Sequence, residues 1–312
     1  MILTVNTAPV AVQSQEARKL LLGLLVGLIA ASIGALYTVY ARWGIAHGLH
    51  SPDLTVLRFG VAGLVTLPVL LRAVLKDSAQ FTARWKIWLA VSVFAGTPFG
   101  LLMFGGLQFA PASHAAVFPF SAMSVVGMLL SAVVLGERLS LRRAGGILLV
   151  LAALVLISGM DSESFSWISA MGDAMFIAAG ILWASFGIIL RRYKLDPLLA
   201  TAVISFSALI TYVPGYLLFT GGGRLLAAAP NVVWTEILVQ GVIAGAGTLY
   251  FYAKMVSLLG ASRAAIFPAL APGLAALMAW PVLDHLPKAL EATGLMIAIV
   301  GLLIAVTATS TR

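Results

Sequence analysis

The sequence predicts an all-α polytopic membrane protein with ten transmembrane helices arranged as two inverted five-helix repeats. Three observations lead to this fold class: the composition, the length of the apolar runs, and a repeat shared by the two halves of the chain. Of the 312 residues, 61% are hydrophobic and 10% are charged, whereas soluble globular proteins average about half and about a quarter. A spanning helix needs about 20 apolar residues. The chain is therefore long enough for ten spans and too short for a large domain outside the membrane.

Ten apolar runs, interrupted by charged and turn-forming residues, are expected to form the spans. Their ends carry cap and turn signals, such as Asp196-Pro197 before the seventh run and Gly221-Gly222-Gly223 after it. The expected spans are residues 20–42, 53–75, 87–108, 113–135, 141–159, 169–190, 197–219, 233–257, 263–283 and 287–309.

These spans divide the chain into five parts, and a sequence repeat relates the two large ones. The parts are a tail (1–19), a first repeat (20–159), a linker (160–168), a second repeat (169–309) and a second tail (310–312). Residues 112–119 read ASHAAVFP and residues 261–268 read ASRAAIFP, with six identities in eight positions at an offset of 149. Because each half holds five spans, the second half must enter the membrane from the opposite side. Inverted repeats of this kind are typical of secondary transporters.

Lysine and arginine are distributed unequally between the two sides of the predicted bundle. With the N-terminus in the cytoplasm, 15 of the 19 basic residues lie on the cytoplasmic side, and Arg42, Arg58, Arg224 and Lys288 lie outside. Short basic loops are retained in the cytoplasm during insertion. We therefore expect a multi-pass protein of a bacterial inner membrane, with both termini cytoplasmic and the linker periplasmic.

The composition argues against several other function classes. Without cysteine, the chain has no disulfides, thiolate metal sites or cysteine nucleophiles. The net charge of +8 comes from scattered residues, so we expect no nucleic-acid partner. No Walker-type phosphate loop is present, and the four histidines lack i, i+4 metal spacing. We expect neither an enzyme nor a cofactor or metal site, and the expected partners are a small-molecule substrate and the lipid bilayer.

The repeat and its flanking residues resemble the drug/metabolite transporter superfamily of the EamA type. The resemblance rests on the five-plus-five inverted repeat, on a small-residue-rich helix with Phe-Pro, and on Gly136-Glu137 followed by Gly145-Gly146. It spans about residues 20–309. The second half departs from the pattern, because Leu286 stands opposite Glu137.

Within that superfamily the chain resembles the YddG-type exporters of aromatic amino acids and related metabolites. The resemblance implies a secondary transporter that exports neutral or aromatic amino acids, or similar small metabolites, by alternating access. A drug or other metabolite carrier of the same fold is one alternative, and a channel or receptor-like membrane protein is another.

A transporter of neutral or zwitterionic solutes needs a cavity with aromatic faces and few polar groups. Trp183 is the first candidate for its wall, because the other six tryptophans lie at or near predicted span ends. Tyr37 has a similar place in the first half. In the eighth span Tyr250 is favoured over Tyr252, since residues two apart point to different helix faces. The alternative for each is a packing role with its polar group bonded to a neighbouring helix.

The repeated pairs Phe118-Pro119 and Phe267-Pro268 are candidates for shaping the cavity. Proline cannot donate a hydrogen bond to the carbonyl four residues back, so a bend is expected at each pair. Such a bend is tolerated within a span where protein or water satisfies the freed carbonyl. Bends that serve only helix packing are the alternative.

Two further polar residues have two interpretations each. His114, near the start of the fourth span, can titrate and couple transport to protons, or it can be a neutral buried histidine. Arg58 can pair with Asp53 or meet a substrate carboxylate.

GxxxG spacings such as Gly23/Gly27 mostly serve packing within the bundle, so the oligomeric state stays open.

The expected orientation can be tested with single cysteines, because the natural chain has none. Ser78→Cys and Ser140→Cys should react with a membrane-impermeant maleimide only from the cytoplasmic side, and Ser162→Cys only from outside. Labelling of Ser162→Cys from the cytoplasm would overturn the five-plus-five arrangement.

Overall fold

The computed structural model of the protein describes residues 10–110, 112–137, 140–158, 167–264, 266–283 and 289–307. Across these ranges the chain is helical apart from short connections, and it contains no strand. Most of the expected linker lies outside the described residues, as do the last five residues and Leu286.

In the described part of the first half, one or two main helices correspond to each expected span. The elements are α1 (Val10–Ala46), α2 (Ser51–Lys76), α3 (Ser78–Ala83), α4 (Trp85–Ala95), α5 (Thr97–Phe109), α6 (Ala112–Leu135) and α7 (Leu141–Ser158). The third span is divided between α4 and α5 at Gly96, just before Pro98.

The second half is helical over the same pattern but contains more irregular segments. Its elements are α8 (Trp167–Tyr193), α9 (Pro197–Thr220), α10 (Gly223–Ala227), α11 (Pro230–Glu236), the π-helix η2 (Ile237–Thr248), α12 (Leu249–Leu259), α13 (Ala261–Ala264), the 3-10 helix η3 (Phe267–Leu270), α14 (Ala271–Leu283) and α15 (Ala289–Thr307).

The cap and turn signals around the seventh span act as the sequence predicts. The Asp196 carboxylate accepts a hydrogen bond from the backbone N–H of Leu199 at 2.8 Å, and Pro197 occupies the first turn of α9. At the other end Gly221 and Gly222 have φ of 61° and 68°, which glycine adopts without strain. These residues fix where α9 begins and ends.

Seven helical segments in the described ranges are long and apolar enough to cross a membrane. They are Gln15–Ala46, Ser51–Lys76, Trp85–Phe109, Phe118–Leu135, Trp167–Tyr193, Pro197–Thr220 and Pro230–Leu259. Large apolar side chains such as Leu25, Leu64 and Leu148 are exposed on the outside of the bundle. An apolar surface of this extent suits contact with lipid.

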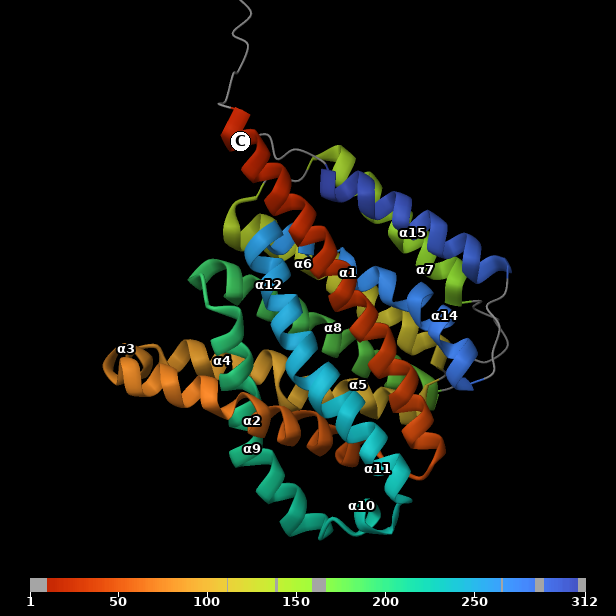
Figure 1. The fold of residues 1–312 in the computed structure, drawn as a ribbon. Coiled ribbons are helices and arrows are strands. Elements are labelled where there is room, and N and C mark those ends of the chain that lie inside the picture. Colours follow the sequence, from red (N-terminus) through yellow and green to blue (C-terminus); the bar gives the residue numbers. More distant parts are fainter. Residues whose placement is uncertain are drawn as a thin grey trace, which may run out of the picture.

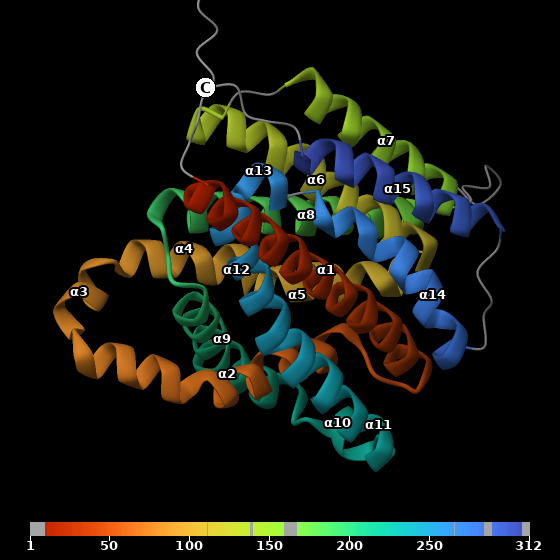
Figure 2. The same cartoon turned by 45° about the horizontal axis from the view of Figure 1, so that its top comes forward.

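Helix packing has the symmetry that an inverted repeat requires. α2 packs on its repeat counterpart α9 at one end of the bundle, and α7 packs on its counterpart α15 at the other (Figures 1 and 2). The packing of α6 on α8 has its counterpart in that of α14 on α1, and α5 on α8 corresponds to α12 on α1. The two halves therefore interleave around a shared centre.

The crossing of α7 and α15 depends on glycine at both helices. A Cβ atom at Gly146 would lie 2.6 Å from the carbonyl oxygen of Gly301, and one at Gly301 would lie 2.7 Å from the carbonyl oxygen of Gly146. The obstructing atoms belong to the backbone, so a larger residue forces the helices apart. Small residues at such crossings drive association in membranes through close packing.

Gly146→Leu should therefore destabilise the protein by about 1–3 kcal/mol, the usual effect of overpacking. The adjacent Gly145 is the matched control, since a Cβ there would have no described atom within 4 Å. Thermal melting of the detergent-solubilised protein should show a lower Tm for Gly146→Leu and a nearly unchanged Tm for Gly145→Leu. Equal Tm values for the two variants would contradict the close crossing.

Candidate functional site

A small cavity lies between the two halves of the bundle. It has a volume of about 30 Å³, which is room for one or two water molecules. Both halves contribute to its wall, which is almost entirely apolar. The lining residues are Ala30, Ala31, Gly34, Tyr37, Phe120, Met123, Trp183, Thr248, Tyr252, Met255, Phe267, Pro268 and Ala271.

Small residues of α1 create the space, and aromatic rings close it. Ala30 and Gly34 are four residues apart, so they lie on one face of α1. Directly before them, Gly27 leaves room for the ring of Phe267, which a side chain at that position would overlap. The α1 sequence thus provides a smooth wall against which residues of the second half pack.

Trp183 is the centre of the aromatic cluster at the cavity. Its ring centroid lies 4.5 Å from that of Phe99, 5.0 Å from that of Tyr252 and 5.7 Å from that of Phe186. A Cβ at Gly187 would lie 2.7 Å from the Tyr252 hydroxyl oxygen, so glycine at this position lets Tyr252 approach α8. The rings come from three helices, and two of them, those of Trp183 and Tyr252, line the cavity.

Four of the eight candidate residues from the sequence line this cavity: Tyr37, Trp183, Phe267 and Pro268. In the eighth span the structure places Tyr252 in the wall, whereas Tyr250 is half-buried and its ring contacts Phe251. The π-helix η2 precedes both tyrosines. A π-helix has more residues per turn than an α-helix, so it changes the direction of the side chains that follow it.

The two Phe-Pro pairs have different surroundings. Phe267-Pro268 begins the short helix η3 and contacts the cavity directly. Pro119 lies inside α6, which continues through it, and the Pro119 carbonyl faces Gly180 of α8 at close range. In the first half Phe120 lines the cavity, and Phe118 does not.

His114 lies away from the cavity, where it joins two helices. Its Nδ1 atom is 2.8 Å from Oδ1 of Asp173, which ties the start of α6 to the start of α8. Its ring also contacts that of Phe118, with the centroids 5.4 Å apart. Each side chain of the His114–Asp173 pair is 18% exposed, so the pair is only partly buried.

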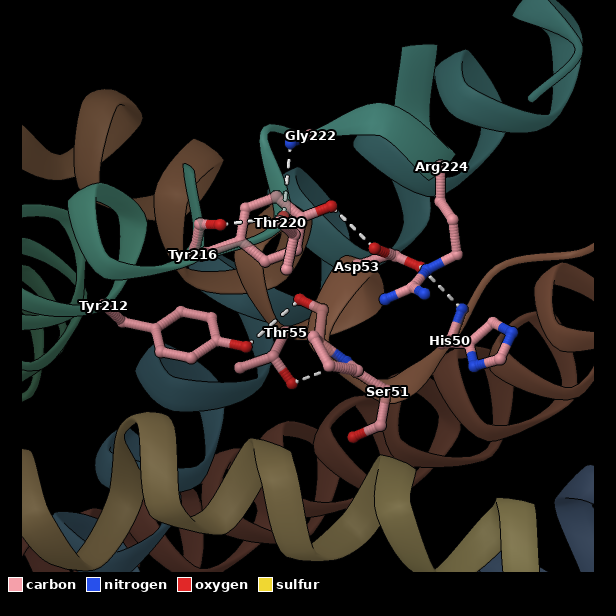
Figure 3. A network of polar contacts seen from close by, with 10 residues as sticks. His50, Ser51, Asp53, Thr55, Tyr212, Tyr216, Thr220, Gly222 and Arg224 are labelled. Carbon is pink, nitrogen blue, oxygen red and sulfur yellow. Dashed lines mark hydrogen bonds and ion pairs between the residues drawn. The ribbon is translucent and has the colours of Figure 1, made fainter. Parts of the chain in front are cut away.

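A polar network holds the start of α2 against the end of α9 (Figure 3). The fully buried carboxylate of Asp53 accepts hydrogen bonds from the Tyr216 hydroxyl at 2.6 Å, the His50 backbone N–H at 2.8 Å and Arg224 Nε at 3.0 Å. Three donors, one of them charged, compensate for the loss of water around this carboxylate. Asp53 is therefore engaged with Arg224 and not with Arg58.

Several residues of the cavity have no distinct sequence signal. Phe120, Met123, Met255 and Thr248 belong to apolar runs in which many similar residues face lipid or other helices.

Trp88, expected near a span end, is buried, and its indole N–H donates to the Phe81 carbonyl at 3.1 Å. Trp183 is therefore not the only tryptophan inside the bundle, but it is the one in the cavity wall.

Comparison with known proteins matches the chain to one family. The model of the EamA-like transporter family matches twice, over residues 21–159 and 170–307. No curated protein matches significantly. Among solved structures 28 chains match. One of them, titled only "Crystal structure of protein", is 20% identical, with a TM-score of 0.69 over 93% of this chain and 96% of that chain. At this identity, the likeness shows the fold alone.

The Asp53 network predicts unequal effects of removing two neighbouring tyrosine hydroxyls. Tyr216→Phe removes a hydrogen bond to a buried carboxylate and should destabilise the protein by about 1.5–3 kcal/mol. Tyr212→Phe removes a 3.3 Å hydrogen bond to the neutral carbonyl of Pro52 and should cost less, about 0.5–1.5 kcal/mol. Melting temperatures in detergent give the comparison, and a larger loss for Tyr212→Phe would disprove the role assigned to Asp53.

Proposed function

Because the chain belongs to the EamA-like transporter family, we propose that it exports neutral or aromatic amino acids, or similar small metabolites, by alternating access. Its membership of that family makes it a multi-pass membrane protein that transports small solutes. The observation that carries the finer proposal is the aromatic cavity between the interleaved halves, with Tyr37 from the first half and Trp183 and Tyr252 from the second. Such a wall suits an amphipathic solute with an apolar or aromatic body.

The cavity also supplies a polar group. Thr248 lines it, and the buried Thr248 hydroxyl has no hydrogen-bond partner among the described atoms. A buried hydroxyl without a partner is costly, so its position favours an interaction with a bound solute or with water. The combination of ring faces and an oriented hydroxyl fits a small polar head on an apolar solute.

The size of the cavity supports a mechanism in which the helices move. At about 30 Å³, it admits water but no amino acid, so helices must separate before a solute enters. In an inverted repeat, exchanging the conformations of the halves moves the opening from one side of the membrane to the other. The chain carries no Walker-type nucleotide site, and we infer that flux follows the gradient of the solute or of a coupled ion.

We further propose the orientation expected from the basic residues, in the inner membrane of a bacterium with both termini cytoplasmic. In support, Arg143, Arg191 and Arg263 line one hollow of about 470 Å³ together with Glu16 and Glu137. Basic residues of α7, α8 and α13 thus gather at one end of the bundle, the end that the distribution of lysine and arginine assigns to the cytoplasm.

Counterflow in proteoliposomes tests the proposed substrate class. Vesicles loaded with unlabelled phenylalanine should accumulate labelled phenylalanine in the absence of ATP. Trp183→Ala should lower this flux about tenfold or more, because the loss of one buried ring contact costs on the order of 1.4 kcal/mol or more of binding free energy. Trp183→Phe should recover much of the flux.

Trp167→Ala is the matched control, since Trp167 lies on the same helix and is 84% exposed. Its flux should equal that of the unmodified protein. A panel of neutral, acidic and basic amino acids, and of unrelated drugs, separates the amino-acid exporter from a drug carrier of the same fold. Flux of drugs without flux of any amino acid would rule out the proposed substrate class.

A further inference from the structure

Arg58 of α2 is a fully buried cation that has no hydrogen-bond acceptor in the described part of the chain. The residue has no exposed surface, and its Nε, Nη1 and Nη2 atoms have no hydrogen-bond partner among the described atoms. The ion pairs within the described ranges do not include it. Guanidinium carries five N–H donors and stays charged, so this arrangement leaves a strong anion-binding group unused.

Aromatic rings surround the guanidinium group. Its central carbon lies 4.3 Å from the ring centroid of Tyr37, 5.8 Å from those of Phe59 and Phe99, and 6.0 Å from that of Phe104. Ring faces attract a cation, and more strongly when it is desolvated. This attraction does not replace the water lost around a buried ion, and rings accept no strong hydrogen bonds.

Two buried acids, Asp53 and Glu236, are candidates for an ion pair with Arg58, and the Glu236 carboxylate itself has no hydrogen-bond partner among the described atoms. Asp53, five residues earlier on α2, accepts three hydrogen bonds in the network with Tyr216 and Arg224. Glu236 packs against the end of α1, where a Cβ at Gly44 would lie 2.6 Å from its Oε1 atom. Neither carboxylate forms an ion pair with Arg58.

Arg58 lies one aromatic layer behind the wall of the central cavity. Tyr37 lines the cavity, and the Arg58 guanidinium lies over its ring. Phe99 contacts both Arg58 and the cavity residue Trp183. The backbone at Arg58 is held in place by η2, since Gly245 lies directly against the Arg58 carbonyl. The backbone position of Arg58 is thus fixed, and the Tyr37 ring contacts both its guanidinium group and the cavity.

We propose that Arg58 binds the carboxylate of the transported solute when the cavity opens and the Tyr37 ring moves aside. A carboxylate matches the planar guanidinium fork with two parallel hydrogen bonds, and it supplies the negative charge that Arg58 lacks in the closed bundle. The substrate class is then a monocarboxylate with an apolar or aromatic body: an amino acid or the corresponding organic acid. This assignment rests on the proposed function and adds its recognition element.

Competition in counterflow tests the assignment. It also distinguishes an amino acid from the corresponding organic acid as the source of the carboxylate. Labelled phenylalanine is exchanged in the presence of 3-phenylpropionate, which lacks the ammonium group, or phenylalaninamide, which lacks the carboxylate. Phenylpropionate should compete and the amide should not. Strong competition by unlabelled phenylalanine with none by phenylpropionate would assign the site to amino acids alone, with Arg58 still required.

Arg58→Gln should raise the half-saturation concentration for phenylalanine about 10- to 100-fold, the effect of losing charged hydrogen bonds, and Arg58→Lys should lose less. Arg72→Gln is the matched control, because Arg72 lies on the same helix and is exposed. If phenylalanine is exchanged and Arg58→Gln leaves its half-saturation and the selectivity against the amide unchanged, the assignment fails while the proposed function stands. If no carboxylate of the panel is exchanged, both fail.

Stability provides a second measurement that needs no transport. If Arg58 serves to bind a ligand, its charge is uncompensated while no ligand is bound. Replacing buried charged groups by apolar residues of similar size often leaves the stability of a protein unchanged or raises it. Arg58→Met should therefore melt at the same temperature as the unmodified protein, or higher. A marked drop in Tm for both Arg58→Met and Arg58→Gln would show that the arginine serves the fold, and would overturn the assignment.

Discussion

Glycine residues at helix crossings set how closely the helices pack, and the cavity depends on that spacing. Within a bilayer, apolar side chains gain little by leaving lipid for protein, so helices associate through close van der Waals contact. Gly27 accommodates the ring of Phe267, and Gly187 accommodates the hydroxyl of Tyr252. A larger residue at either position would displace a side chain of the cavity wall. The contacts that hold the bundle together are thus also those that position the site.

The helical architecture was predictable because a bilayer allows few alternatives. A backbone in hydrocarbon must satisfy its own hydrogen bonds, so a long apolar run has to be a helix. The repeated Phe-Pro motif at a constant offset indicated two related halves, in agreement with the two matches to the family model. The regular parts of the fold follow from these constraints, which act on whole segments and not on single residues.

The direction of individual side chains was less predictable, since it depends on local hydrogen bonding and on distant partners. Tyr252 lines the cavity in place of Tyr250, after a π-helix that the sequence does not announce. Asp53 is five residues from Arg58, but its partner is Arg224, which is 171 residues away. One helix, α2, thus carries one buried charge with three hydrogen bonds and another that has none among the described atoms. Only the three-dimensional arrangement reveals that contrast.

The two halves carry related sequences but differ in backbone conformation. The fourth span runs as one helix through Pro119, whereas its counterpart contains a 3-10 segment that begins at Phe267. Gly96 separates two helices, whereas its counterpart Gly245 lies within a π-helix. One molecule therefore displays both forms of the repeat at once, and in the proposed alternating-access cycle the two halves exchange these forms. In that proposed cycle the balance between the two conformations depends on the positions at which the halves differ, such as His114 against Arg263.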